Sequence, residues 1–180
     1  QGVQGFSLAL ELTNEFISII NSLTDVDLNT VKKAILKEIV PALKDIDEKC
    51  REIADLTDMD YYGIDASLAP LPIEDSSVAQ LIESLFLESF GSHGTLFITS
   101  YLTNLLKDII KQSNINSCGF NGVMFSQLED SGMGKRNNTR NFSIDSLLSY
   151  SSVCGCGIDM VPIPGNCFEE EISSLILDVA

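Results

Sequence analysis

The chain has 180 residues, of which 44% are apolar, and its 26 acidic and 11 basic side chains give a formal net charge of −15. This length and apolar content predict one folded domain with a core rather than a disordered tail. The acidic charge disfavours binding to nucleic acid or to an anionic membrane surface, and no apolar run reaches the ~18 residues that a membrane span needs.

Two helices are predicted in the first third of the chain. Apolar residues recur at spacings near 3.6 over 5–22, which predicts the first helix. A long second helix is expected to begin after a cap at Asn29 or Thr30 and to be kinked or split at Pro41. Its apolar stripe is expected to pack on a sheet, although it could instead be a partner surface: Ile35, Ile39, Leu43, Ile46, Cys50 and Ile53.

The middle of the chain alternates between short strands and helices. Residues 61–69 predict a strand with Asp65 and Ser67 on the same side. Ser77 is a predicted cap for a helix that continues to about Ser89. Three further segments follow in order, and their predicted ranges are 95–112 for a helix, 115–127 for a strand region and 128–141 for a long surface loop.

The last third combines a short helix, a glycine-rich strand and a terminal helix. The short helix is predicted at 143–149, and a buried strand that ends in a shaped loop is predicted within 152–165. A final helix is predicted from Glu169 to Ala180, with three glutamates in its first turn. Strands that alternate with helices favour an α/β fold with mainly parallel strands, and no internal repeat or domain linker is evident.

We therefore expect residues 1–180 to form a single α/β domain. The chain does not begin with Met, and its last helix stops without a capping residue. We expect it to be a fragment of a longer protein.

The five cysteines favour a reducing, cytoplasmic location, because their number is odd and their spacing has no disulfide framework pattern. Cys154 and Cys156 could bind a metal or form a redox pair, but no further ligands are grouped with them, so no metal site is predicted. They could equally be small buried apolar residues. A nucleophilic Cys154 would need a base, and His93 is the only histidine.

Two carboxylates stand where catalytic groups often stand in α/β proteins. Asp65 and Asp159 each follow an isoleucine in a strand-like segment and precede a proline-containing loop. At the carboxyl end of a strand such groups could deprotonate or position a substrate. They could instead cap the following turn through backbone N–H groups.

A short glycine-flanked loop, 91–95, precedes a predicted helix and is a candidate site for an anionic small molecule. Its amides and the hydroxyls of Ser92 and Thr95 could hold an anion, with His93 and Gly94 in the same turn. His93 could also simply bond to a neighbouring loop. Three basic residues of the 128–141 segment could recruit an anion or be solvated: Lys135, Arg136 and Arg140.

Several motifs occur in the order seen in one uncharacterised family. They are Gly63-Ile-Asp-Ala-Ser-Leu-Ala-Pro70, Gly91-Ser-His-Gly-Thr95, Leu128-Glu-Asp-Ser-Gly-Met133 and the segment from Ser152 to Gly165. The chain resembles the family of domain of unknown function 711, often labelled "PFL family protein", over nearly all of its length. The resemblance implies a fold similar to the α/β barrel of pyruvate formate-lyase and no known reaction.

The resemblance carries the family's motif residues to Asp65, Ser67, Pro70, His93, Gly94, Cys154, Gly157, Asp159 and Pro162. At Cys156 the family commonly has a small or β-branched residue, which weakens a two-thiol mechanism. The chain has no Arg-Val-x-Gly-Tyr-like loop, so glycyl-radical chemistry is not expected.

The leading hypothesis is a cytoplasmic protein, a candidate enzyme of unknown reaction, with a small-molecule site at the strand ends. Its predicted catalytic residues are Asp159, Asp65, His93 and Cys154, and its predicted ligand-binding residues are Ser67, Ser92, Gly94, Thr95 and Gly157. No cofactor is indicated by the sequence. The alternatives are a non-catalytic binding or regulatory module and a structural protomer that forms homo-oligomers through the 35–53 stripe.

Overall fold

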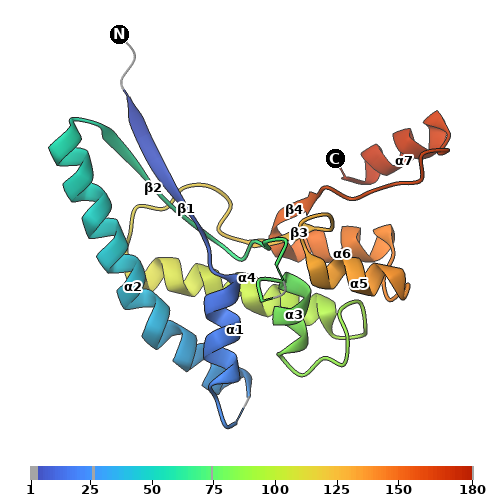
Figure 1. Ribbon diagram of the computed structural model, residues 1–180, viewed down its shortest axis with the longest axis horizontal. Helices are drawn as coiled ribbons and strands as arrows, with labels where there is room; N and C mark the ends of the chain where they lie inside the picture. The colour runs from blue at the N-terminus through green and yellow to red at the C-terminus, as the bar shows by residue number, and fades with distance from the viewer. Residues whose placement is uncertain (1–3, 26, 74, 180) are drawn as a thin grey trace.

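A computed structural model describes residues 4–25, 27–73 and 75–179 of the chain. It is a mixed α/β structure (Figure 1). The elements in chain order are β1 (Gly5–Glu11), α1 (Thr13–Asn21), α2 (Leu28–Thr57), β2 (Asp60–Ser67), α3 (Val78–Glu83), α4 (Thr95–Ser113), β3 (Val123–Ser126), α5 (Ser131–Asn138), α6 (Ile144–Cys154), β4 (Gly155–Asp159) and α7 (Glu169–Val179).

The strands are parallel, as predicted. β1 pairs with β2, and β3 pairs with β4, in two small parallel sheets. An isolated parallel bridge from Leu68, the residue after β2, to Val123 of β3 joins the two sheets, so the spatial order is β1-β2-β3-β4. A second parallel bridge links Ile64 of β2 to Ser117, in the segment before β3. No closed barrel is formed by the described residues.

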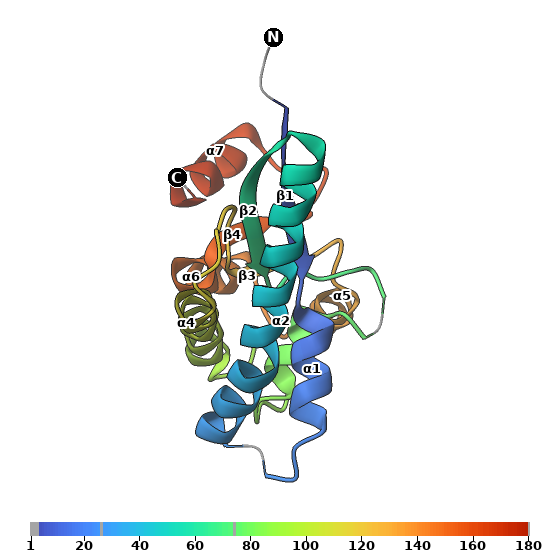
Figure 2. The same cartoon turned by 90° about the vertical axis from the view of Figure 1, so that its left-hand side faces the viewer.

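Each of β1, β2 and β3 is followed by two helices, and the second of each pair is the longer. The long helices α2, α4 and α6 connect successive parallel strands, as such a connection requires. α4 packs against both α2 and α6. α7 stands apart from the other helices in both views (Figures 1 and 2).

The prediction of a helix over 5–22 is wrong for the first half of that range. Gly5–Glu11 is strand β1, and only the second half forms helix α1. The residues Leu8 and Leu10 alternate with more exposed neighbours, which is the period of a strand. The segment forms a strand rather than a helix because pairing with β2 satisfies its backbone hydrogen bonds.

The long second helix is continuous through Pro41 rather than split. It begins one residue after Asp27, whose side chain accepts hydrogen bonds from Asn29 N and Thr30 N, so Asp27 is the cap rather than either predicted residue. In the predicted stripe Ile35, Ile39, Leu43 and Cys50 are buried and Ile46 is partly buried, whereas Ile53 is 49% exposed. Most of the stripe therefore does not offer the free surface on which the oligomer hypothesis was based.

Four other predicted boundaries or environments change. α3 is capped by Ser77 as predicted but ends at Glu83. The predicted 128–141 loop contains helix α5, which begins after the cap Asp130. α6 continues to Cys154, so strand β4 begins later than predicted and is not buried.

The predicted helix 95–112 is confirmed as α4, and Ala180, the predicted end of the last helix, lies outside the described residues.

One face of the strands packs on the helices and forms the core. Ile64 and Ala66 of β2, Leu68 directly after it, and Val123 and Phe125 of β3 are buried there. No helix among the described residues has both the length and the apolar character to cross a membrane.

Candidate functional site

The opposite face of the strands carries polar side chains near the carboxyl ends. The register places Ala9 beside Asp65 and Glu11 beside Ser67. Paired residues on neighbouring strands point to the same face, so Glu11, Asp65 and Ser67 share one face of the sheet. This confirms that Asp65 and Ser67 lie on the same side of the strand.

Asp65 is held by three hydrogen bonds. Its carboxylate accepts from Ser67 Oγ (2.5 Å), Phe120 N (2.9 Å) and Asn121 N (3.0 Å). A Cβ on Gly119 would lie 2.1 Å from Asp65 Oδ2, and the φ of Gly119 is +73°, so this turn requires glycine. Asp65 therefore fixes the backbone that leads into β3, in agreement with the capping interpretation of this residue.

A pocket of about 200 Å³ lies at the carboxyl ends of β1 and β2. Three carboxylates line it, from Glu11, Asp65 and Glu129, and Ser67 contributes a hydroxyl. Ala69, Pro70, Leu71, Pro72 and Met124 supply much of its apolar wall. The pocket lies where α/β proteins commonly bind ligands.

Cys154 is fully buried at the end of α6, and its sulfur contacts local backbone. The N–H groups of Gly157 and Cys156 donate to Cys154 Sγ, with N···S distances of 3.0 and 3.4 Å. The hydrogen bonds of Cys154 Sγ are with local backbone groups, and none joins it to His93, its partner in the predicted nucleophile–base pair. Gly157 thus takes part in a tight turn around the sulfur.

Cys156 lies close to Asp65 and Ser67 rather than to a base. The pKa of its thiol is raised to about 12, mainly by burial and also by the nearby Cys154 and Asp65, and a hydrogen bond with Ser67 opposes this increase only in part. The thiol is therefore protonated at neutral pH and is a poor nucleophile.

Asp159 is exposed at the end of β4, and its side chain makes no hydrogen bond or ion pair with the described part of the chain. Its backbone pairs with Ser126, so the two residues share a face of the sheet. Asp159 does not line the pocket that holds Asp65.

The Gly91–Thr95 loop lies in the helical layer. The hydroxyl of Thr95 is buried, donates to Ser92 O (2.8 Å) and accepts from Gly91 N (3.1 Å). Ser92 Oγ donates to Ser89 O (2.6 Å), and Gly94 caps α4 with a φ of +103°. His93 is exposed and lines a separate pocket of about 440 Å³ with Ser146, Ser149 and Tyr150.

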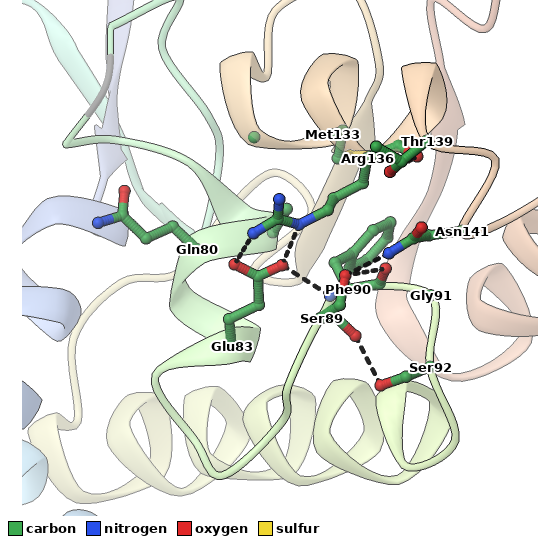
Figure 3. A network of polar contacts seen from close by, with 12 residues as sticks. Gln80, Glu83, Ser89, Phe90, Gly91, Ser92, Met133, Arg136, Thr139 and Asn141 are labelled. Carbon is green, nitrogen blue, oxygen red and sulfur yellow. Dashed lines mark hydrogen bonds and ion pairs between the residues drawn. The ribbon is translucent and has the colours of Figure 1, made fainter.

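A polar network ties this loop to α3 and α5 (Figure 3). Arg136 donates to both carboxylate oxygens of Glu83, at 2.6 and 2.9 Å, and Phe90 N donates to Glu83 Oε1 at 2.7 Å. Asn141 Nδ2 donates to Ser89 Oγ beside it. The hydrogen bond with Glu83 raises the pKa of Arg136, so this predicted anion recruiter is engaged within the fold.

The structure thus brings together Asp65 and Ser67, with Cys156 beside them, and leaves His93 and Asp159 apart from that group. No two of the four predicted catalytic residues bond to each other within the described residues. No group of three or more metal-ligating side chains occurs in the described ranges either. Two residues of this pocket, Glu11 and Glu129, were not predicted from the sequence. The alternation of apolar and polar residues along β1 could have indicated Glu11, and Glu129 lies in the Leu128–Met133 motif.

These features define an α/β protein with a parallel sheet and an acidic pocket at its strand ends. Residues 2–180 match the family described as "Uncharacterised ACR (DUF711)", and the chain belongs to that family. This confirms the resemblance seen in the sequence motifs.

Relatives named "UPF0210 protein" are similar to this chain. The protein from Limosilactobacillus fermentum is 40% identical over 124 residues, which cover 66% of this chain and 27% of the relative. The protein from Methanococcoides burtonii is 31% identical over 161 residues, which cover 89% of this chain and 36% of the relative. The chain therefore spans about a quarter to a third of the length of these relatives.

Proposed function

We propose that the chain supplies a small-molecule-binding site at the carboxyl ends of β1, β2 and β3. The observation that carries this proposal is the pocket lined by Glu11, Asp65, Ser67 and Glu129. In the proposed site Asp65 is a positioning residue, because its carboxylate holds Ser67 and the backbone of the 120–121 turn. Binding is the proposed role, and catalysis by Asp65, Asp159, His93 or Cys154 remains a prediction.

The chemistry of the pocket favours a small ligand with a cationic group. Its volume of about 200 Å³ is below the roughly 300 Å³ typical of sites for larger ligands. Three carboxylates and no basic side chain line it, so a primary amine gains ion pairs there, whereas an anion is repelled. The apolar wall suits a short aliphatic chain.

The pocket beside His93 is a second candidate, for the predicted anionic ligand. Gly94 precedes α4 and provides no side-chain cap, and Thr95 N donates to Ser92 O, so the amides of Leu96 and Phe97 are the ones that could meet an anion at the start of this 19-residue helix. The exposed His93 and the volume of about 440 Å³ support this assignment.

A titration of the isotope-labelled chain, followed by the NMR shifts of its backbone amides, tests both sites. The probes are putrescine and ethanolamine for the acidic pocket and inorganic phosphate for the His93 pocket. We expect the amines to shift the signals of Ser67 and Met124, and Glu11→Gln to weaken their binding about two- to fivefold, the size of a partly exposed ion pair. The matched control is Glu52→Gln on the exposed face of α2.

Amine binding that is unchanged in Glu11→Gln, or the absence of shifts at Ser67 and Met124, contradicts the acidic site. Phosphate shifts at His93 and Gly94 support the second candidate, and their absence contradicts it.

We also propose that the four strands belong to a larger α/β barrel similar to that of pyruvate formate-lyase, without radical chemistry. The consecutive parallel order of β1 to β4 supports this fold. A cytoplasmic location is proposed as well, supported by five cysteines that form no disulfide.

A further inference from the structure

The acidic pocket at the strand ends holds two carboxylates that pair with no group in the described part of the chain. Three carboxylates line the pocket, but that of Asp65 already accepts three hydrogen bonds from the fold. The carboxylates of Glu11 and Glu129 have no hydrogen-bond or ion-pair partner within the described residues. The pocket therefore offers two free anionic groups rather than one.

These two carboxylates come from opposite sides of β2. Glu11 is the exposed last residue of β1, and Glu129 is half-buried in the turn that follows β3. β1 and β3 flank β2, so they lie about 10 Å apart, which is two strand spacings. The apolar side chains of Leu71 and Met124 line the same pocket. The pocket thus presents an anionic group on each side and an apolar wall.

The turn that carries Glu129 is fixed by the fold. Glu129 N and Asp130 N both donate to Ser126 O, with N···O distances of 3.2 and 3.0 Å. Asp130 is buried, and its carboxylate accepts from the first amides of α3 and α5. Because the turn is held from both sides, the Glu129 carboxylate is positioned before any ligand arrives, which lowers the entropic cost of binding.

Ser126, at the base of this turn, has a fully buried hydroxyl with no hydrogen-bond partner among the described residues. Ser126 lies two residues after Met124 on β3, so both side chains are on the pocket side of the strand. A buried hydroxyl without a partner is unfavourable and marks a place for a further polar group. An ammonium group has three N–H donors, so one held at Glu129 can donate to this hydroxyl as well.

The basic residues of the chain are segregated from the pocket. All 11 lysine and arginine residues lie in or directly after helices α2, α4 and α5, and none is in a strand or lines the pocket. No group of three or more metal-ligating side chains occurs in the described ranges. Two separated carboxylates without internal cations favour a ligand with two separate positive charges over a single metal ion.

We propose that the pocket binds a short linear diamine, with one ammonium group at Glu11, the other at Glu129 and the methylene chain on the apolar wall. This inference rests on the proposed amine site and adds that the ligand carries two charges. The volume of about 200 Å³ limits the ligand to a short chain. A diamino acid of the same length is disfavoured, because its carboxylate meets Glu11 or Glu129.

The test is an NMR titration of the isotope-labelled chain with three ligands that differ only in their charged groups. Butylamine has the carbon chain of putrescine but one ammonium group, and ornithine adds a carboxylate to putrescine. We expect putrescine to bind about two- to fivefold more tightly than butylamine, the effect of a second partly exposed ion pair. Ornithine should bind more weakly than putrescine.

Glu129→Gln should abolish the preference for putrescine over butylamine, and Glu11→Gln, on the other side of β2, should do the same. Glu52→Gln on α2 is the matched control, since it removes the same charge far from the pocket and should preserve the preference. The amide spectrum of each variant also reports whether it is folded.

The diamine proposal is overturned if the chain binds putrescine and butylamine equally, or if the preference survives in Glu129→Gln. If both amines shift the signals of Ser67 and Met124 without a preference, the amine site stands and only the diamine assignment fails. If neither amine shifts these signals, both the amine site and the diamine assignment fail.

Discussion

At the scale of single residues, Cys156 shows how environment decides whether a thiol reacts. Its thiol lies beside Asp65 and Cys154 in a partly buried position, and its pKa is raised to about 12. A raised pKa favours the neutral thiol, and only the thiolate is alkylated rapidly. Iodoacetamide should therefore modify Cys156 very slowly at pH 8, with a rate that rises about tenfold per pH unit up to roughly pH 11.

Peptide mass spectrometry after timed alkylation measures this rate. The control is the same chain unfolded in urea, where the thiol returns to a pKa of about 8.5 and the rate levels off above that value. Equal alkylation of Cys156 in the folded and unfolded chains at pH 8 would show that the folded site does not suppress the thiolate.

At the scale of secondary-structure elements, one buried carboxylate joins two helices. Asp130 accepts from Gly132 N and Met133 N at the start of α5, and from Val78 N and Ala79 N at the start of α3. Ser77, the cap of α3, also donates to it at 2.5 Å. Asp130 thus satisfies the free amides of two helix ends that are far apart in the sequence.

Asp130→Asn should lower the free energy of unfolding by about 3 kcal/mol or more, because an amide NH₂ then faces buried donors and the charge is lost. Urea denaturation measures the change. Asp145→Asn in the first turn of α6 is the control, since that side chain is exposed and makes no hydrogen bond within the described residues. A loss below about 1 kcal/mol would contradict the two-helix role of Asp130.

The individual helices and strands also show which parts of the fold could be predicted from the sequence. α2 and α4 have long apolar stripes, and both were found. β1 was missed because Phe6 and Leu10 fit both a helical and a strand period, and only pairing with β2 resolves the two. α5 was missed because Gly132, Gly134 and Asn137 are weak helix formers, and the helix depends on the cap at Asp130.

For the candidate site, too, the sequence predicts only the contacts between residues that are close together along the chain. Asp65 and Ser67 are two residues apart on one strand, so their proximity could be predicted from local geometry. Glu11 joins them only through the pairing of β1 with β2, which is distant in sequence. The separation of His93 from Cys154 likewise depends on helix packing that no spacing rule encodes.

At the scale of the whole molecule, excess negative charge opposes the folded state. The chain carries a net charge of −15, and the ion pairs within the described ranges include Lys32–Asp108, Lys37–Glu38, Arg51–Asp47 and Arg136–Glu83. Partly exposed pairs contribute at most about 1 kcal/mol each. Added salt screens both the ion pairs and the long-range repulsion among the remaining carboxylates. The repulsion is the larger of the two energies, so screening should stabilise the fold.

Raising NaCl from about 0.01 to 0.15 M shortens the screening length from about 30 to about 8 Å. We expect the melting temperature to rise by about 2–4 °C, the shift that roughly 1 kcal/mol produces in a domain of this size. Choline chloride at equal ionic strength is the control, because choline is too bulky for tight carboxylate sites. Equal shifts in the two salts identify screening as the cause, whereas a shift with sodium alone identifies a bound cation, and a fall in the melting temperature contradicts the dominance of repulsion.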